Sequence, residues 1–230
     1  MKVSIHKSKI EGKVRAPSSK SYTLRGLMCA ALARGESEII HPLSSDDTEA
    51  ALNVLGQIGV RIHQERDSWR VNGGNFHQPA SELFCGESAT TLRFMTAIGS
   101  LIPGKCRLVP GPSLARRPVR PLIQALRQLG VNCSSQGEVA PVIVDGGRLK
   151  GGATELPGNI SSQFVSALLF ISPLANEKVT IRLTTPLESK PFVLMTLDCL
   201  EKFGIKVKYS QDLREFKVSK QEYKPTKYRV

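Results

Sequence analysis

Apolar side chains recur at helical spacing in the segment that follows residue 20. They stand three or four residues apart, as one face of a buried helix requires, at Leu24, Leu27, Met28, Ala31 and Leu32. Pro17 disfavours helix just before this run, and Ser18 and Ser19 are residue types that cap helix N-termini. Gly35 suits the position directly after a helix. The pattern therefore predicts a helix that begins near Lys20 and ends before Gly35.

The order helix, strand, helix, strand, strand then recurs along the chain. A glycine followed by Val or Ile ends the second helix of each unit, at Gly59, Gly130 and Gly204, so the pattern repeats about every 70 residues. The further predicted helices are 46–58, 88–98, 119–129, 161–169 and 192–203; the predicted strands are 2–5, 12–16, 37–41, 61–64, 69–72, 106–109, a pair that opens at 131 and ends at 142–144, 179–183, 206–209 and 215–218. We expect a mixed α/β fold with three βαβαββ-type units, at 14–78, 79–150 and 151–225, around a pseudo-threefold axis.

The length and cysteine content predict a stable hydrophobic core without disulfide bonds. A chain of 230 residues can bury roughly 70% of its unfolded surface. The five cysteines are an odd number without a CxxC pair, which favours free thiols over a disulfide framework or a zinc site. No run approaches the ~18 apolar residues of a membrane span. These features predict a soluble, cytoplasmic protein without a metal.

The net charge of +12 suggests an anionic ligand. Nucleic acid is the first candidate, but aromatic residues are only 6% and no RNA-binding or zinc-finger motif is present, so we expect no nucleic-acid partner. Many basic residues instead fall at predicted helix starts and loops: Lys20, Arg25, Arg93, Arg116, Arg117, Arg120 and Lys190. This distribution fits a small ligand with several negative charges.

The first helix of each unit begins with polar, cap-type residues: Ser18-Ser19-Lys20-Ser21, Glu87-Ser88-Ala89-Thr90 and Ser161-Ser162-Gln163. Helix N-termini attract anions through unpaired N–H groups and the helix dipole. If the units pack about a threefold axis, these three starts converge on one face. Capping alone would explain the serines, but not Lys20, Arg25, Arg93 and Gln163 in the same turns.

Six segments together resemble one family, the 5-enolpyruvylshikimate-3-phosphate synthases. They are PSSKSYTLRGLMCAALA, SSDDTEAALNVLGQIGV, CGESATTLRFM, SLARRPVRPLIQALRQLGV, NISSQFVSALLFISPLA and LESKPFVLMTLDCLEKFGI, in this order. The resemblance covers the chain but only the first part of the family's two-domain enolpyruvyl transferase fold. It implies that the shikimate-phosphate domain spans 14–225, that 1–13 is a strand region packed with the missing second domain, and that 226–230 starts the crossover between domains.

The resemblance also implies a reaction without a metal or organic cofactor. The 5-hydroxyl of shikimate 3-phosphate adds to C2 of phosphoenolpyruvate, and phosphate then leaves. The shikimate 3-phosphate ligands would be Lys20, Ser21, Arg25, Ser161, Ser162, Gln163 and Ser189. The phosphoenolpyruvate ligands would be Lys20, Ala89, Arg117 and Gln163, with Lys20 as the catalytic residue.

Three departures from the family pattern qualify these expectations. Ala89 stands where many members have glycine, and in this family such an alanine is associated with tolerance to glyphosate. Phe192 replaces a tyrosine of some members. The second domain, which supplies the proton-transferring carboxylates, is missing, so the chain alone should not turn over and could self-associate.

Two other readings stay open. One is the related enolpyruvyl transferase acting on UDP-N-acetylglucosamine, which usually has Lys-Asn in place of Lys20-Ser21. The other is a non-catalytic module that binds polyanions, with steep salt dependence. Asp46 and Asp47 read most simply as a helix N-cap, although their place in the first unit puts them near the predicted cleft.

Overall fold

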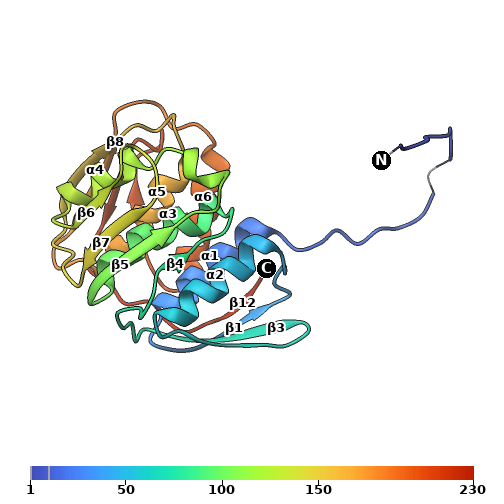
Figure 1. Cartoon of the computed structure of the whole chain (residues 1–230), viewed down its shortest axis with the longest axis horizontal. Helices are drawn as coiled ribbons and strands as arrows, with labels where there is room; N and C mark the ends of the chain where they lie inside the picture. The colour runs from blue at the N-terminus through green and yellow to red at the C-terminus, as the bar shows by residue number, and fades with distance from the viewer. Residues whose placement is uncertain (1, 10) are drawn as a thin grey trace.

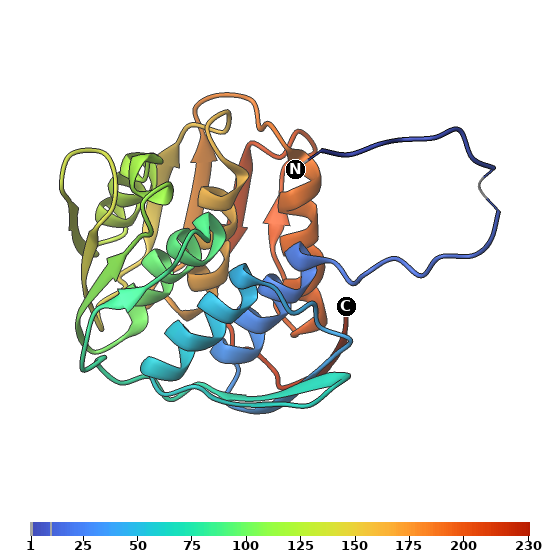
Figure 2. The same ribbon diagram turned by 45° about the vertical axis from the view of Figure 1, so that its right-hand side comes forward.

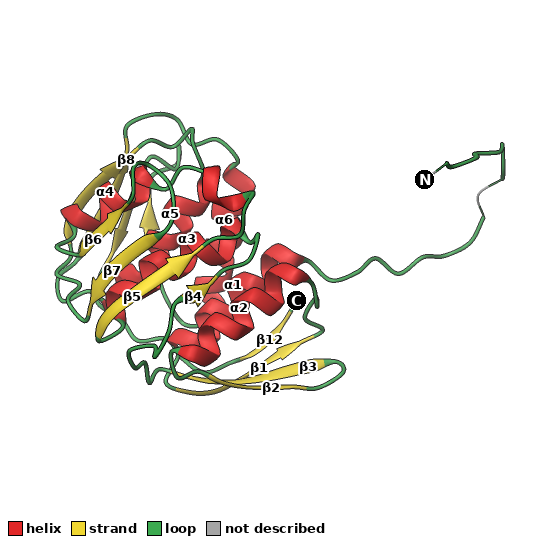
Figure 3. Cartoon of the chain, in the orientation of Figure 1, coloured by secondary structure: helices red, strands yellow, loops and turns green. Residues whose placement is uncertain are grey.

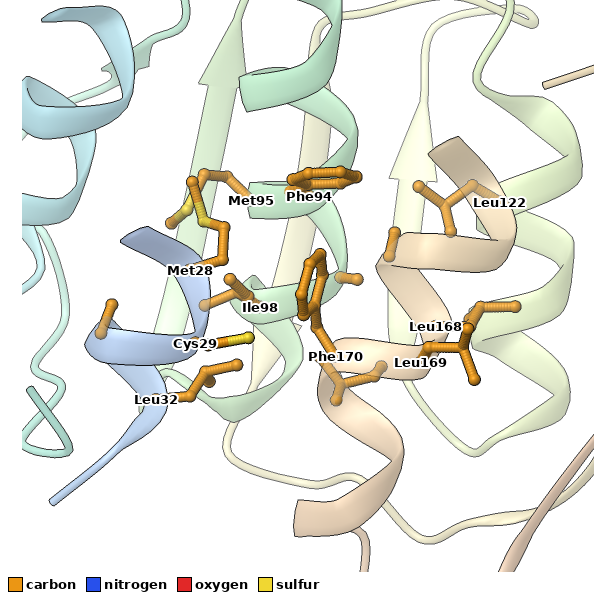
Figure 4. Packing of buried hydrophobic residues seen from close by; sticks show 14 of the residues in the cluster. Met28, Cys29, Leu32, Phe94, Met95, Ile98, Leu122, Leu168, Leu169 and Phe170 are labelled. Atoms are coloured by element: carbon orange, nitrogen blue, oxygen red, sulfur yellow. The ribbon is translucent and has the colours of Figure 1, made fainter. Parts of the chain in front are cut away.

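Three helices that are apolar on nearly all sides form the centre of the protein. The structure is a computed structural model that describes residues 2–9 and 11–230 (Figure 1). The central helices are α1 (Lys20–Leu32), α3 (Ala89–Ile98) and α5 (Ser162–Ile171). Each begins one repeated unit and is buried along almost its whole length, as expected for helices without a polar face. Phe94 of α3 meets Phe170 of α5 edge to face at a centroid distance of 5.0 Å (Figure 4).

The second helix of each unit buries only one face. These helices are α2 (Asp46–Gln57), α4 (Arg120–Gln128) and α6 (Lys190–Lys202). In α4, for example, Leu122, Ile123, Ala125 and Leu126 are buried while Arg127 is exposed. Such helices cover a core on one side and meet solvent on the other. Short 3-10 turns follow α3 and α5 and precede α4, at Gly99–Leu101, Ser172–Leu174 and Leu114–Arg116.

Three four-stranded sheets enclose the helices and share one topology (Figure 3). Their strand orders are β12-β1-β3-β2, β4-β5-β7-β6 and, reading the third sheet from its other edge, β8-β9-β11-β10. The strands are β1 (Gly35–Ile40), β2 (Arg61–Gln64), β3 (Ser68–Gly73), β4 (Leu83–Phe84), β5 (Gly104–Val109), β6 (Asn132–Ser135), β7 (Val142–Gly146), β8 (Gly152–Leu156), β9 (Val179–Leu183), β10 (Lys208–Tyr209), β11 (Glu215–Val218) and β12 (Lys227–Arg229). The predicted threefold repeat of helix, strand, helix, strand, strand is therefore confirmed.

The end of the chain completes the sheet of the first unit. In each sheet one edge strand runs parallel to the central strand: β4 beside β5, β8 beside β9 and β12 beside β1. β4 and β8 precede the first helix of their units, whereas β12 comes after all three units. It pairs Glu38 with Lys227 and Ile40 with Arg229.

The strands predicted at 2–5 and 12–16 are wrong. No strand forms there, and the described residues before α1 extend away from the helices and sheets (Figures 1 and 2). Val3, Ile5 and Val14, which suggested strands, are 68%, 91% and 96% exposed. Both sides of β1 are paired with other strands, β12 on one side and β3 on the other. The sequence prediction also missed β4, β8 and β12.

The structure also bears on the α2 cap, on the cysteines and on membrane-spanning helices. Ser45, rather than Asp46 or Asp47, caps α2, and it forms a capping box with Thr48. All five cysteines are buried free thiols, as expected. In the part of the chain that the structure describes, no helix has the length and apolar character needed to cross a membrane.

Candidate anion-binding site

The central helices start with the same serine cap. Ser19 Oγ accepts a hydrogen bond from the backbone N–H of Tyr22 at 3.3 Å. Ser88 Oγ accepts one from Thr91 N–H at 3.2 Å, and Ser161 Oγ accepts one from Gln163 N–H at 3.3 Å. The serines thus satisfy one orphan N–H group of each helix. The remaining N–H groups and the positive dipole ends are the elements of an anion site.

Polar contacts join these helix starts into one face. Lys20 of α1 forms an ion pair with Asp47 in the first turn of α2. The backbone carbonyl of Asp47 accepts a hydrogen bond from Thr91 Oγ1 of α3 at 3.2 Å. Thr90 Oγ1 in turn accepts a hydrogen bond from Gln163 Nε2 of α5 at 2.9 Å. A continuous set of contacts therefore runs from Lys20 to Gln163, residues that lie far apart in the sequence.

Arg93 holds a positive charge at the centre of this face. One terminal nitrogen donates to Ser161 Oγ at 3.1 Å and to Gln163 Oε1 at 2.7 Å; the other donates to the carbonyl of Pro118 at 3.3 Å. The side chain lies over the ring of Phe164 and is 8% exposed, and its Nε finds no hydrogen-bond partner among the described residues. All of its acceptors are neutral.

Burial and the nearby guanidinium of Arg117 lower the pKa of Arg93 to about 10. Burial disfavours the charged form, and a second positive group disfavours it further. Arg117 itself is exposed and follows the 3-10 turn Leu114–Arg116. An anion bound against both guanidinium groups would relieve this repulsion, so the electrostatics favour a ligand such as a phosphate.

Arg25 is more deeply buried than the sequence suggested. Only 2% of it is exposed, and it donates through Nε to Thr196 Oγ1 at 2.8 Å and through its terminal nitrogens to the carbonyls of Ser21 and Phe192, both at 3.1 Å. Its guanidinium lies 5.5 Å from the ring centroid of Phe94 and 5.8 Å from that of Phe192. Burial lowers its pKa. Arg25 thus ties the start of α1 to the start of α6.

The other predicted site residues lie at the starts of helices or in the loop before α4. Lys20 is exposed, Ser21 is half-buried, and Ser162 and Ala89 are the first residues of buried helices. Ser189 precedes α6 in the left-handed conformation, with φ of 54°, and is exposed. The hydrogen bond from Arg25 to Phe192 O joins the first turn of α6 to that of α1.

Three residues of this face were not predicted as site residues. The sequence favours a helix cap for Asp47 over a place near the cleft, but Ser45 is the cap and the Asp47 carboxylate pairs with Lys20. Thr90 was read only as a polar residue of a helix start, but it binds Gln163. Glu87 contacts the loop that leads to Arg117: it accepts hydrogen bonds from Ser113 and Leu114. Each of these contacts depends on a partner 26 or more residues away, which local spacing does not reveal.

Comparison with known families gives a match over nearly the whole chain. Residues 5–230 match the sequence model of the family described as "EPSP synthase (3-phosphoshikimate 1-carboxyvinyltransferase)". A 3-phosphoshikimate 1-carboxyvinyltransferase of Dehalococcoides mccartyi is 47% identical over 232 residues, covering 100% of this chain and 55% of the relative. The enzyme of the same name from Methanocaldococcus jannaschii is 40% identical, covering 96% and 53%. The chain therefore spans about half the length of the curated relatives it matches.

Solved structures agree with this result. An EPSP synthase from Acinetobacter baumannii superimposes with a TM-score of 0.84 at 26% identity, covering 95% of this chain and 50% of that chain. The enolpyruvyl transferase NikO from Streptomyces tendae superimposes with a TM-score of 0.67 at 18% identity, covering 96% and 52%. At that identity the second likeness shows the fold alone.

Proposed function

Because this chain belongs to the EPSP synthase family, we propose that it is the shikimate 3-phosphate-binding half of an enolpyruvyl transferase. In the proposed reaction the 5-hydroxyl of shikimate 3-phosphate loses its proton and its oxygen forms a bond to C2 of phosphoenolpyruvate, while C3 gains a proton. The bond from C2 to the phosphate oxygen then breaks and C3 loses a proton, so that an enol ether and inorganic phosphate result. The enzyme would serve aromatic amino acid biosynthesis.

The single observation that carries this proposal is the buried guanidinium of Arg93. It is 8% exposed, has only neutral hydrogen-bond acceptors, and shares its surroundings with a second guanidinium, that of Arg117. A buried charge without a counter-charge is costly. Both substrates carry phosphate groups, which would supply that counter-charge at the starts of the three central helices.

We assign the substrate contacts by residue. The shikimate 3-phosphate contacts are Lys20, Ser21, Arg25, Ser161, Ser162, Gln163 and Ser189; the phosphoenolpyruvate contacts are Lys20, Ala89, Arg117 and Gln163. Gln163 is supported in a shared role because it already bridges Arg93 and Thr90 between α3 and α5. Lys20 is supported as the catalytic cation because its amine is exposed and pairs with Asp47, a partner it can exchange for phosphate.

The second half of the enzyme is the proposed partner. Since the chain spans about half the length of its relatives, the acid and base groups of the reaction would come from the other half, and this chain alone would not turn over. We propose that 14–225 forms the substrate-binding domain. Residues 1–13 would contact the other half, and 226–230, which contribute β12 to the first sheet, would lead towards it. Without that half, the exposed Val3, Ile5 and Val14 favour self-association.

Calorimetric titration of the chain with shikimate 3-phosphate tests the proposal. We expect weak binding that Lys20→Ala abolishes, while Lys105→Ala, an exposed lysine on β5, leaves it unchanged. A separately produced second half and phosphoenolpyruvate are then added, and we expect enolpyruvyl transfer with release of phosphate. Enolpyruvyl transfer by this chain alone would contradict the proposal that the acid and base groups come from the other half. No transfer even with the second half present would overturn the proposed function.

The same titration separates the two other readings. Preference for UDP-N-acetylglucosamine over shikimate 3-phosphate would indicate the related transferase, a reading that the family match disfavours. Binding to heparin or DNA that falls steeply with salt and ignores shikimate 3-phosphate would indicate a polyanion-binding module.

A further inference from the structure

Glu87 connects two parts of the site that the proposed function uses. It lies two residues before Ala89, the first residue of α3, and is held in place by the turn at Gly86 and the cap at Ser88. Its side chain reaches the loop 111–117, which ends at Arg117. One carboxylate oxygen accepts hydrogen bonds from Ser113 Oγ at 2.5 Å and from Leu114 N–H at 2.9 Å, and the other accepts one from Ser113 N–H at 3.3 Å.

These bonds satisfy donors that the loop cannot satisfy by itself. The 3-10 turn Leu114–Arg116 has no side-chain cap of its own: Ser113 occupies the cap position, but its hydroxyl is donated to Glu87. A carboxylate offers acceptors only, on two oxygens, so it matches three converging donors without presenting a hydrogen of its own. Hydrogen bonds to an ionised acceptor are also stronger than neutral ones.

The backbone at Gly86 and Gly111 leaves room for the contact between the Glu87 carboxylate and the loop. Gly111 N–H donates to the carbonyl of Gly86 at 2.7 Å, which brings the two segments together directly beside the carboxylate. A Cβ atom at Gly111 would lie 2.5 Å from Glu87 Oε1, so only glycine fits there without displacing the carboxylate. The Ala115 N–H then bonds to Gly111 O, and the Arg117 N–H bonds to Leu114 O. Hydrogen bonds therefore link Gly86 to the start of this loop and hold the loop backbone from Gly111 to Arg117.

We propose that Glu87 is a positioning residue that holds the loop 111–117, so that Arg117 faces the phosphate of phosphoenolpyruvate together with Arg93. This inference rests on the proposed function for its substrate. Glu87 touches no reacting atom. It acts through the loop, and its carboxylate interacts electrostatically with Arg117 at the end of that loop. The hydrogen bond from Ser113 lowers the pKa of Glu87, so the carboxylate stays ionised at neutral pH.

Backbone amide hydrogen exchange of the 230-residue chain tests the structural part. In Glu87→Gln we expect the Ser113 and Leu114 amides to exchange at least about tenfold faster, since one oxygen is replaced by a donor. Glu87→Asp keeps the charge but shortens the reach, so we expect a partial effect. The matched control is Glu82→Gln, which removes an exposed carboxylate that pairs with Arg107 on β5. Amides of α3 report whether each variant is folded.

Steady-state kinetics with the second half present test the functional part. We expect Glu87→Gln to raise KM for phosphoenolpyruvate about tenfold, to change kcat less than threefold, and to leave KM for shikimate 3-phosphate unchanged. Unchanged exchange at Ser113 and Leu114 would overturn the inference. So would faster exchange with an unchanged KM for phosphoenolpyruvate. If the unsubstituted protein transfers no enolpyruvyl group, the proposed function fails, and the exchange result still decides whether Glu87 holds the loop.

Discussion

Gly26 of α1 lies directly against the ring of Tyr228 in β12. A Cβ atom on Gly26 would be 2.5 Å from Tyr228 Cε1 and 2.7 Å from Cδ1. The Tyr228 hydroxyl also lies 3.2 Å from Cys199 Sγ of α6, and the ring packs against Phe203. The strand near the end of the chain is thus fixed against both the first and the last helix, and the absence of a side chain at residue 26 permits this.

Replacing this glycine should destabilise the protein. Gly26→Ala would force Tyr228 and β12 away from α1, at a cost of about 1 to 3 kcal/mol in the free energy of unfolding. Urea denaturation measures this change. The control is Gly56→Ala on the exposed side of α2, where a Cβ atom meets nothing within 4 Å. That variant should gain about 0.5 to 1 kcal/mol, because alanine favours helix. Equal stability of both variants would contradict the predicted clash.

The hydroxyl of Thr196 should be needed for the buried position of Arg25. Thr196 Oγ1 accepts from Arg25 Nε at 2.8 Å and lies 2.8 Å from Ser166 Oγ. Thr196→Val keeps the shape but leaves buried polar groups without a partner, so we expect a loss of about 1 to 3 kcal/mol in unfolding free energy. Thr180→Val, on a half-exposed position of β9, should change it by less than about 0.5 kcal/mol. A loss at Thr196 no larger than this control would show that Arg25 does not depend on the hydroxyl.

Ala89 should weaken inhibition by glyphosate. It is the first residue of α3 and is 7% exposed, so its methyl group faces a packed environment at the proposed phosphoenolpyruvate site. One additional methyl group costs a crowded ligand about 1 to 3 kcal/mol. We expect the enzyme with both halves to be weakly inhibited, and Ala89→Gly to be inhibited roughly 5-fold to 150-fold more strongly. Ala153→Gly, exposed on β8, is the control. Comparable inhibition before and after Ala89→Gly would refute this prediction.

The buried cysteines should be unreactive in the folded protein. Burial raises the pKa of Cys85 to about 12 and those of Cys106, Cys133 and Cys199 to about 11, from an ordinary value of 9.0. Since the thiolate is the reactive form, a chromogenic disulfide reagent at pH 8 should label the native chain slowly. It should label all five thiols after unfolding in urea. Rapid labelling of one thiol in the native chain would identify a local opening at that position.

The same pKa shifts predict a loss of stability at alkaline pH. The pKa values of the thiols are higher in the folded chain than in the unfolded chain. As the pH rises through about 9, the unfolded chain therefore loses thiol protons before the folded chain does. The stabilisation is complete below pH 9 and is lost as the pH approaches 11. Urea denaturation between pH 7 and about 10.5 should show a flat region followed by a decline. A free energy of unfolding that is constant over this range would contradict the predicted linkage.

The sequence alone determined the elements that depend on neighbouring residues. Helical spacing of Leu24, Leu27 and Met28 predicted α1, and the serines at 19, 88 and 161 predicted its start and those of α3 and α5. Capping and burial of one face act within a few residues, so they leave a local pattern. The repeat was visible for the same reason, because each unit repeats that pattern.

Tertiary structure decided which distant segments pair. The sequence pattern predicts a strand at 12–16, where none forms, and it gives no sign that β12 pairs with β1, although Glu38 lies opposite Lys227. It favours a helix cap for Asp47 over a place near the cleft, although Asp47 pairs with Lys20, and it gives no sign that Arg25 is enclosed by Thr196 and Phe192. Strand pairing and the burial of a charge depend on which surfaces meet after the three units pack. Spacing within one segment carries no information about that choice.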